Sequence, residues 1–205
     1  MGYDYDQTHE KIVESAIAHF KDKGYSGASI RQICKDAGVT NGAFYAHFDS
    51  KEDLFSSIVS PVVDGMKEIY DAENSHYMDI ETVEDVRNVL KETFSSNRKL
   101  IRYVFEHAGI FRIILSGGAG TEYEGFCDDL AEEEASNTRA FLDRLRQITG
   151  KNDLMSETLI RHISRLLIYS AFEGLSAGRS EDEVVKETEL ASEFCLAGMK
   201  HFLGI

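Results

Sequence analysis

The stretch that decides the fold runs from Ser29 to Leu54 and reads SIRQICKDAGVTNGAFYAHFDSKEDL. One apolar face of a helix repeats at positions i, i+3, i+4 and i+7. That spacing is occupied here by Ile30, Ile33, Cys34 and Ala37. Gly38 follows directly and can end the helix in a left-handed conformation, which glycine adopts without steric penalty. The pattern predicts a short helix up to Ala37 and then a turn.

Residues with capping side chains stand at each point where a helix would begin. Ser29 and Gln32 have the spacing of a capping box, and so do Ser50 and Asp53. Thr40 can cap a second helix over residues 41–47 through its hydroxyl. Two short helices joined by a glycine-containing turn form the helix-turn-helix unit, whose second helix enters the major groove of DNA. The stretch therefore predicts a DNA-binding head.

A longer set of positions extends this pattern in both directions. In order, it comprises Ile12, Ala16, Phe20, Gly24-Tyr25, Ala28-Ser29-Ile30, Ile33, Ala37-Gly38-Val39-Thr40, Gly42, Phe44-Tyr45, His47-Phe48, Ser50-Lys51 and Leu54-Phe55. With these positions, residues 9–55 closely resemble the DNA-binding domain of the tetracycline-repressor (TetR) family. The resemblance implies a three-helix helix-turn-helix domain at residues 1–50. It also implies a helical ligand-sensing and dimerisation domain at residues 51–205.

Contacts to DNA are assigned by the reach of each side chain in such a unit. The expected DNA-binding residues are Ser29, Arg31, Gln32, Thr40, Asn41, Gly42, Ala43, Tyr45, His47 and Lys51. Asn41 can donate to and accept from an adenine edge, Gly42 lets the backbone approach closely, and Ala43 can touch a thymine methyl. The others offer hydroxyl, amide or cationic groups to phosphates, and Arg31 could reach a base instead. Phe44 and Phe48 are expected in the core.

The charge of the chain opposes this assignment. The 205 residues carry a net charge of −14, and residues 1–60 hold six Lys or Arg against nine Asp or Glu. A nucleic-acid binder usually shows a basic patch. Phosphates, however, feel charges within a Debye length of about 8 Å, so a local face can bind DNA on an acidic protein. The motif outweighs the composition.

The second half reads as helices throughout, and no convincing strand alternation occurs, so the fold class is all-α. Helices are expected from Lys51 to about residue 72 with Pro61 inside, over 82–106 with a break near 95–97, over 122–149, near 159–171 and over 181–202. The glycine-rich segment 116–121 is expected to be a linker, because it lacks the ending of a phosphate-binding P-loop. Residues 1–8 are expected to be a loose lead.

The resemblance implies that the second half senses a small-molecule effector. Its candidate ligand-binding residues are His107, Phe111, Phe126, Arg165, Tyr169 and Phe172, with Phe105, Phe141 and Glu173 as further candidates. The last two helices carry broad apolar stripes, which are a natural surface for a homodimer. The expected partners are therefore a double-stranded DNA operator, an effector and a second copy of the chain. The family mostly represses transcription, so a repressor is favoured.

Two alternatives to a ligand-responsive repressor remain. An all-helical enzyme is suggested only by the spacing of Glu73 and His76, which recurs in carboxylate metal sites. A redox-sensing regulator would use Cys127 or Cys195. We expect no catalytic residues, no metal site and no cofactor. Without a long apolar run or a signal peptide, and with three widely spaced cysteines, the chain is expected to be cytoplasmic.

Overall fold

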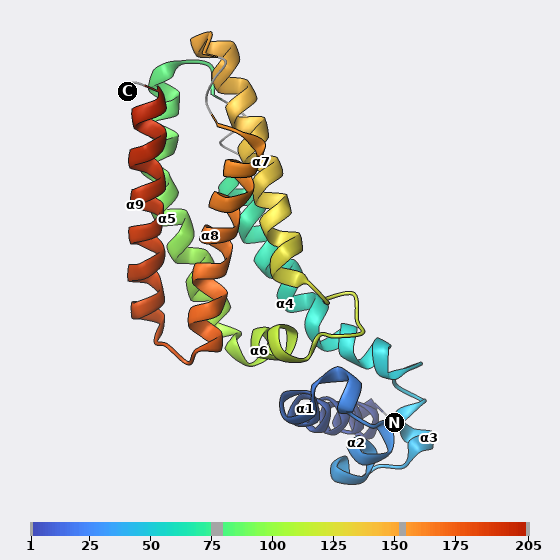
Figure 1. Cartoon of the computed structure of the whole chain (residues 1–205). Helices are drawn as coiled ribbons and strands as arrows, with labels where there is room; N and C mark the ends of the chain where they lie inside the picture. Colours follow the sequence, from blue (N-terminus) through green and yellow to red (C-terminus); the bar gives the residue numbers. More distant parts are fainter. Residues whose placement is uncertain (1, 75–79, 152–154, 204–205) are drawn as a thin grey trace. The chain divides into compact units, whose positions relative to one another are not determined.

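The computed structural model describes residues 2–74, 80–151 and 155–203. Over these ranges all regular elements are helices and no strand occurs, in agreement with the predicted all-α class. The helices are α1 (Gly2–Gly27), α2 (Ile30–Ala37), α3 (Asn41–Phe44), α4 (Lys51–Asn74), α5 (Val83–Glu106), α6 (Ala108–Gly117), α7 (Phe126–Thr149), α8 (Glu157–Ser176) and α9 (Glu181–Leu203) (Figure 1). A helix-turn-helix is thus followed by a helical body.

The chain forms two compact units. The first unit combines Met1–Gly65 with His107–Phe126, so α1 to α3 and the start of α4 group with α6. The second unit combines Met66–Glu106 with Cys127–Ile205. These units reflect contacts between residues and not a division by function. The functional division into residues 1–50 and 51–205 therefore stays a prediction.

The core of the first unit is built from the apolar faces that the sequence marks on α1, α2 and α4. Its fully buried side chains include Ile12, Ala16, Phe20, Ile33, Phe44, Leu54 and Phe55. The Phe20 and Phe55 rings meet edge to face with centroids 5.0 Å apart. Aromatic pairs in this geometry add to the free energy gained from burying apolar area. Phe44 and Phe48 are both buried, so their predicted packing role is confirmed.

Helix α1 is longer than predicted. It begins at Gly2, so the expectation of a loose lead over residues 1–8 is wrong for the described residues 2–8. The tertiary reason is visible at Tyr5, whose hydroxyl donates a hydrogen bond to the carbonyl oxygen of Ala46 at 3.2 Å. At the other end, Gly24 has φ 67° and interrupts the regular helix.

Helix α6 packs directly on the end of α1 through two glycines. A Cβ atom added to Gly117 would lie 2.7 Å from the Cα of Gly24, closer than real Cβ contacts allow. The hydroxyl of Ser26 also donates to the carbonyl oxygen of Ala119 at 2.9 Å. Close approach of two backbones is a recognised use of glycine. This contact fixes α6 within the first unit.

The segment between α6 and α7 is tied to the start of α4. Tyr123 and Ser60 share a hydrogen bond of 2.8 Å between their hydroxyl oxygens, and Ser56 donates to Glu122 at 3.1 Å. Gly125 has φ 82°, a left-handed conformation that interrupts a helix. Helix α7 therefore begins at Phe126, and the predicted start at residue 122 is wrong.

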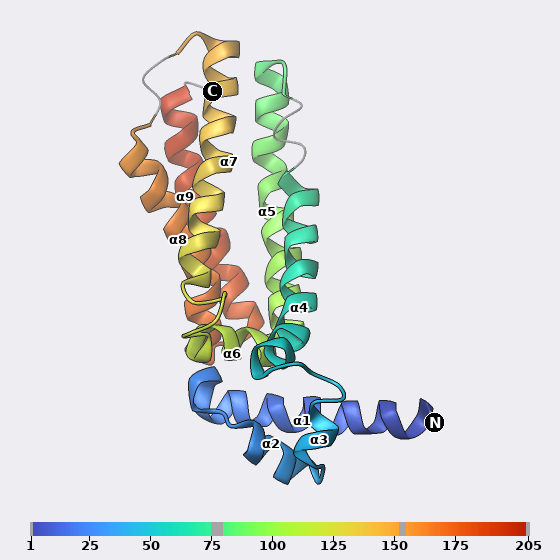
Figure 2. The same ribbon diagram turned by 90° about the vertical axis from the view of Figure 1, so that its right-hand side faces the viewer.

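The second unit is a bundle of long helices. Its core includes Ile80, Val86, Ala135, Phe141, Leu142, Leu145 and Ile160. Helices α8 and α9 run side by side, and α9 also packs along α5 (Figure 2). Helix α5 continues from Val83 to Glu106, so the predicted break near residues 95–97 is wrong. None of the helices, within the residues described, is long and apolar enough to cross a membrane.

Two capping pairs mark helix starts in this half. The amide N–H of Asp85 donates to the Thr82 hydroxyl, and the Asp85 carboxylate accepts from the amide N–H of Thr82 at 2.8 Å. The carboxylate of Glu183 accepts from the amide N–H of Ser180 at 2.9 Å, which lowers the pKa of Glu183. Such reciprocal bonds satisfy donors that a helix start leaves free. Local spacing alone predicts both helix starts.

Candidate functional site

The turn between α2 and α3 is set by Gly38. This residue has φ 70°, and its amide N–H donates to the carbonyl oxygen of Lys35 at 3.2 Å. The amide N–H of Val39 donates to the carbonyl oxygen of Cys34 at 2.9 Å. Together these bonds form a Schellman motif, which satisfies the last carbonyls of a helix. The chain therefore leaves α2 in one defined direction, as the sequence predicts.

Helix α3 starts at a threonine cap. The Thr40 hydroxyl accepts a hydrogen bond of 3.1 Å from the amide N–H of Ala43, as predicted. The buried ring of Phe44 holds the helix in the core, while Asn41 and Gly42 are exposed on its outer side. Because one face is anchored and the other is open, the short helix presents its first residues to a partner.

The start of α2 differs from the prediction. Ser29 makes no capping hydrogen bond with its side chain. The Gln32 amide instead donates to Asp36 at 2.9 Å, one turn further along α2. This bond, followed by the bond from His19, lowers the pKa of the Asp36 carboxyl. The predicted capping box of Ser29 and Gln32 is therefore wrong, because the Gln32 side chain bonds to Asp36 instead.

Most residues predicted to contact DNA lie at the surface of the first unit. Ser29, Arg31, Thr40, Asn41, Gly42 and Tyr45 are exposed, and Gln32, Ala43, His47 and Lys51 are half-buried. Tyr45 is 57% exposed although its ring centroid lies 5.2 Å from that of the buried Phe44. An aromatic side chain that stays in water next to the core is available to a partner. The fold brings all ten residues onto one compact unit.

Lys51, a predicted phosphate contact, has its ammonium group held in place by contacts within the protein. Its ammonium group donates to the carbonyl oxygens of Tyr25 at 2.7 Å and Ala28 at 3.0 Å. It also lies 4.3 Å from the centroid of the Tyr25 ring, a distance typical of a cation–π contact. Burial lowers the pKa of Lys51. Two of its three N–H donors are thus used inside the protein.

His47 lies at the far end of the helix-turn-helix from Ser29, next to residues of α1. Its Nδ1 atom is buried and has no hydrogen-bond partner among the described residues. The Tyr5 ring lies over it, with ring centroids 3.9 Å apart. Burial lowers the pKa of His47, the nearby His9 lowers it further, and Asp6 opposes both effects. Neutral imidazole is therefore favoured in the free protein.

The predicted ligand-binding residues divide between the two units. His107, Phe111 and Phe126 belong to the first unit, where the Phe111 and Phe126 rings are buried with centroids 6.2 Å apart. Arg165, Tyr169 and Phe172 belong to α8 in the second unit. The six residues therefore do not form a single set within one unit.

In the second unit, two of these residues converge on one carboxylate. Arg165 donates to Asp128 at 2.5 Å and the Tyr169 hydroxyl donates to the same oxygen at 2.9 Å. Phe172, one turn further, is buried. The sequence therefore selected α8 residues with shared neighbours but missed Asp128, their common partner on α7.

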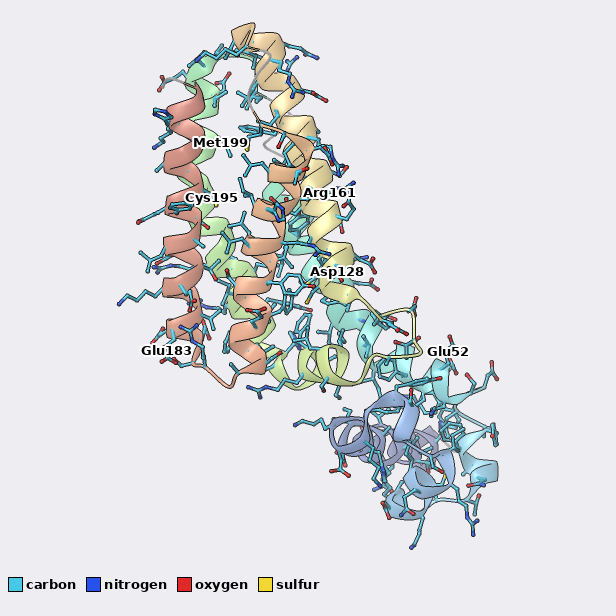
Figure 3. The ribbon with its side chains drawn as sticks, viewed as in Figure 1. Glu52, Asp128, Arg161, Glu183, Cys195 and Met199 are labelled. Atoms are coloured by element: carbon cyan, nitrogen blue, oxygen red, sulfur yellow. The ribbon has the colours of Figure 1, made fainter. Side chains whose placement is uncertain are left out.

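A pocket of about 360 Å³, lined mainly by charged residues, lies between α7 and α8. Its lining is Asp128, Ala131, Glu132, Glu157, Thr158, Arg161, His162 and Arg165. Figure 3 labels Asp128 and Arg161, which contribute to the pocket from the two helices. Of the residues predicted for ligand binding, Arg165 lines it. Charged residues at i and i+4 on α7 and α8 could have indicated this pocket from the sequence. Such spacing also occurs on ordinary solvated helix faces, so it does not identify a pocket by itself.

The pocket carboxylates Glu132 and Glu157 are paired with Arg161 in the pocket and with Arg139 outside its lining. Arg139 and Arg161 each form ion pairs with both Glu132 and Glu157. The hydrogen bond from Arg139, followed by the charge of Arg161, lowers the pKa of Glu132. A ligand entering this pocket would have to compete with these ion pairs.

The thiols lie in environments that disfavour the reactive thiolate. Burial and the carboxylates of Asp128 and Glu173 raise the pKa of Cys127 to about 11. Burial raises the pKa of Cys195 as well. Because the thiolate is the nucleophile and the form that oxidises, raised pKa values argue against a redox sensor. Cys34 is buried as a small apolar filler.

The enzyme alternative gains no support from the described residues. His76 of the Glu73–His76 pair lies outside them. Over residues 2–74, 80–151 and 155–203, no group of three or more His, Cys, Asp or Glu side chains is arranged to hold a metal ion.

Comparison with known proteins gives the same assignment for the first unit. Residues 12–58 match the family model of bacterial regulatory proteins, tetR family. The chain is 28% identical over 140 residues to YttP of Bacillus subtilis (strain 168), a probable HTH-type transcriptional regulator, covering 66% of this chain and 68% of YttP. It is 33% identical over 60 residues to IcaR of Staphylococcus aureus (strain Newman), the negative transcriptional regulator of the biofilm operon icaADBC. That match covers 29% of this chain and 32% of IcaR.

The fold is similar to that of a transcriptional regulator (TerR/AcrR family) from Aquifex aeolicus VF5. The TM-score is 0.55 at 18% identity, over 92% of this chain and 99% of that chain. At this level of identity, the similarity speaks to the fold. Together with the family match and the helix-turn-helix geometry, it extends the likeness from the DNA-binding unit to the helical body. Residues 12–58 are therefore similar to the bacterial regulatory proteins of the tetR family, and the fold of the chain is similar to that of a transcriptional regulator.

Proposed function

We propose that the chain is a ligand-responsive repressor, which binds a palindromic operator as a homodimer and is released by a small-molecule effector. The observation that carries the DNA part is the anchored α3 helix. Phe44 is fully buried beneath it, while Asn41, Gly42 and Tyr45 remain exposed on its outer side. A rigid helix with exposed amide, backbone and hydroxyl groups can read base edges and hold phosphates at the same time.

In this proposal, the other predicted residues position the helix on the DNA backbone. Ser29 has a hydroxyl not engaged in capping, and Arg31 places an exposed guanidinium in the first turn of α2. Lys51 contributes the N–H donor that its two carbonyl bonds leave over. Phosphate contacts of this kind set register but carry no sequence information. Specificity would rest on Asn41, Gly42 and Ala43.

The dimer part rests on apolar side chains that α8 and α9 leave in water. Leu166 is 45% exposed, Leu190 is 58% exposed and Phe194 is 77% exposed. These residues lie on two helices that pack side by side, so their exposed faces can form one surface. A palindromic operator requires two helix-turn-helix units related by a two-fold axis. A second copy bound to this surface would provide the second helix-turn-helix unit and remove the apolar side chains from water.

The effector part rests on the second unit. Its α8 helix carries Arg165, Tyr169 and the buried Phe172, and Arg165 lines the pocket between α7 and α8. An effector can shift operator affinity only if it binds the free and DNA-bound conformations with different affinity. Repression is favoured over activation because the relative IcaR is a negative regulator.

The decisive experiment measures binding of the purified protein to genomic fragments that flank its own gene. We expect saturable binding to a palindromic site, and loss of that binding in the double variant Asn41→Ala, Tyr45→Phe. The matched control is Asn88→Ala, because Asn88 is an exposed asparagine on α5 in the second unit. Absence of specific binding by a folded wild-type protein at low salt would overturn the proposal.

A second experiment tests the dimer surface. Phe194→Glu is expected to convert a dimer into a monomer in sedimentation equilibrium, because a charge cannot be buried in an apolar interface without a partner. The neighbouring Glu193 is also exposed, so Glu193→Gln serves as the control and should leave the dimer intact. A Phe194→Glu protein that remains dimeric would place the interface elsewhere.

A further inference from the structure

A cluster of rings joins the beginning of α1 to the end of the helix-turn-helix. The Tyr5 and His47 ring centroids lie 3.9 Å apart with an interplanar angle of 34°, and the His9 centroid lies 5.6 Å from that of His47. The Tyr5 hydroxyl donates to the carbonyl oxygen of Ala46, directly before His47. We name Tyr5, His9 and His47 the histidine cluster. Its members come from segments about forty residues apart in the chain.

The position of His47 makes its protonation sensitive to its surroundings. One ring nitrogen, Nδ1, is buried and lacks a hydrogen-bond partner among the described residues, while the side chain as a whole is only half-buried. The neutral imidazole carries its single proton on one ring nitrogen, and the other ring nitrogen can only accept a hydrogen bond. Adding a second proton makes both ring nitrogens donors and places a positive charge near His9.

The charged and titratable groups facing His47 come from α1. They are Tyr5, Asp6 and His9. Of these, Asp6 favours the protonated form of His47, while His9 and burial disfavour it. In the free protein, burial and His9 therefore outweigh Asp6 and favour the neutral form of His47. A DNA phosphate would add negative charge at this point.

Cationic side chains are scarce in this unit, which increases the importance of His47. Residues 1–60 hold six Lys or Arg against nine Asp or Glu. Lys51 already directs two donors to the carbonyl oxygens of Tyr25 and Ala28. One more positive charge on each helix-turn-helix unit would therefore be a large fractional increase in the number of cations that can neutralise DNA phosphates.

We propose that operator binding takes up a proton at His47, which then donates to a DNA phosphate, with Tyr5 holding the imidazole in place. The proposal rests on the operator binding proposed above. In the step itself, one solvent proton adds to the neutral imidazole, and no other bond forms or breaks. Tyr5 acts as a positioning residue through its stacked ring and its bond to Ala46.

The direction of the pH effect follows from linkage. The free protein has a His47 pKa below its usual range, and a bound phosphate raises it, so the complex holds more protons than the separate partners. Affinity must then rise as the pH falls through the interval between the two pKa values. A rise of one pKa unit on binding corresponds to about a tenfold gain in affinity for each subunit.

The test measures operator affinity between pH 6.0 and pH 8.5 at constant ionic strength by fluorescence anisotropy. Wild-type affinity is expected to rise about tenfold or more as the pH falls. The variant His47→Gln keeps a polar side chain but cannot titrate, so its affinity should change less than twofold over that range. Tyr5→Phe keeps the ring but loses the bond to Ala46, and should show an intermediate slope.

Calorimetry gives an independent readout that a purely structural role would not change. Operator titrations in phosphate and Tris buffers, which differ in ionisation enthalpy, count the protons taken up. Wild type should take up protons at pH 7, and His47→Gln should take up measurably fewer. Equal uptake by both proteins would overturn the inference.

The pH series also separates this inference from the proposed function. Specific operator binding that is independent of pH would overturn proton uptake while leaving the repressor proposal intact. Absence of specific binding at every pH would overturn both. A wild-type slope that survives in His47→Gln would assign the proton to another group and reject His47.

Discussion

The ammonium nitrogen of Lys51 lies 2.7 Å from the carbonyl oxygen of Tyr25. The same nitrogen reaches the carbonyl oxygen of Ala28, so the first residue of α4 holds the short connection between α1 and α2. A side chain expected at the DNA backbone is thus also a structural clamp of the first unit. The two roles predict different consequences of its loss.

Replacement of Lys51 by methionine should destabilise the protein by about 2 kcal/mol, because the variant loses two charge-assisted hydrogen bonds and leaves two carbonyl groups without their donor. Thermal unfolding followed by circular dichroism measures the effect. Lys67→Met is the control, since Lys67 is exposed on the same helix. An unchanged melting temperature combined with weaker DNA binding would show that Lys51 acts only on phosphate.

Gly117→Ala should destabilise the protein by about 1–3 kcal/mol, as expected when a packed contact is overfilled. The added Cβ would approach the Cα of Gly24 to 2.7 Å, and backbone atoms cannot yield as a flexible side chain can. Urea unfolding provides the measurement. In Gly198→Ala the new Cβ would meet no heavy atom of the described residues within 4 Å beyond its own stretch of α9. Higher helix propensity should therefore stabilise α9 by up to about 1 kcal/mol. Equal effects at both positions would contradict the packing argument.

Glu134→Gln should stabilise the protein at neutral pH. The Tyr70 hydroxyl donates to the Glu134 carboxyl at 2.5 Å, and burial raises the pKa of that carboxyl. A raised folded-state pKa means that wild-type stability falls as the pH rises above the unfolded value, by about 1.4 kcal/mol in total for each unit of elevation. Glutamine still accepts the Tyr70 bond and does not ionise.

Unfolding free energies of wild type and Glu134→Gln measured from pH 4 to pH 8 check this prediction. Their difference should grow with pH, since both side chains are uncharged at the acid end. The exposed neighbour Glu133 gives the control variant Glu133→Gln, for which we expect only a small change. A constant difference across the range would mean that Glu134 ionises normally in the folded protein.

Salt should weaken operator binding only moderately. If about four to six phosphates are neutralised per dimer, the slope of log K against log salt concentration is about −4 to −5. Titration of the operator complex with potassium chloride measures this slope at a pH where His47 is neutral. A slope steeper than about −8 would reveal a basic surface that the present residues do not account for.

The helix-turn-helix could be predicted from the sequence because the residues that form its turn and its cap act on neighbouring backbone groups. Gly38 and Thr40 act through backbone groups within five residues, so spacing alone identifies the turn and the cap. The prediction failed where a distant or competing partner decides the outcome. Gln32 bonds to Asp36 instead of capping α2, and Tyr5 bonds to Ala46 and supports a longer α1.

The contacts of the candidate ligand-binding residues could be predicted only in part. Arg165 and Tyr169 stand one turn apart on α8, which sequence can detect, but Asp128 reaches them from α7 across the fold. Helical spacing identifies the members of one face and gives no information about which other helix lies opposite. Pockets built from two helices, such as that between α7 and α8, therefore escape a reading of one stretch at a time.

The docking of Gly117 on Gly24 also constrains how the protein is made. Residues 107–126 belong to the same compact unit as residues 1–65, yet a ribosome adds them about forty residues later. Until they emerge, the nascent DNA-binding head lacks α6 and the Tyr123 ring that packs 6.1 Å from Phe55. The head is therefore completed only after the intervening part of the body has been synthesised, and a nascent chain stalled before residue 107 would carry an unfinished one.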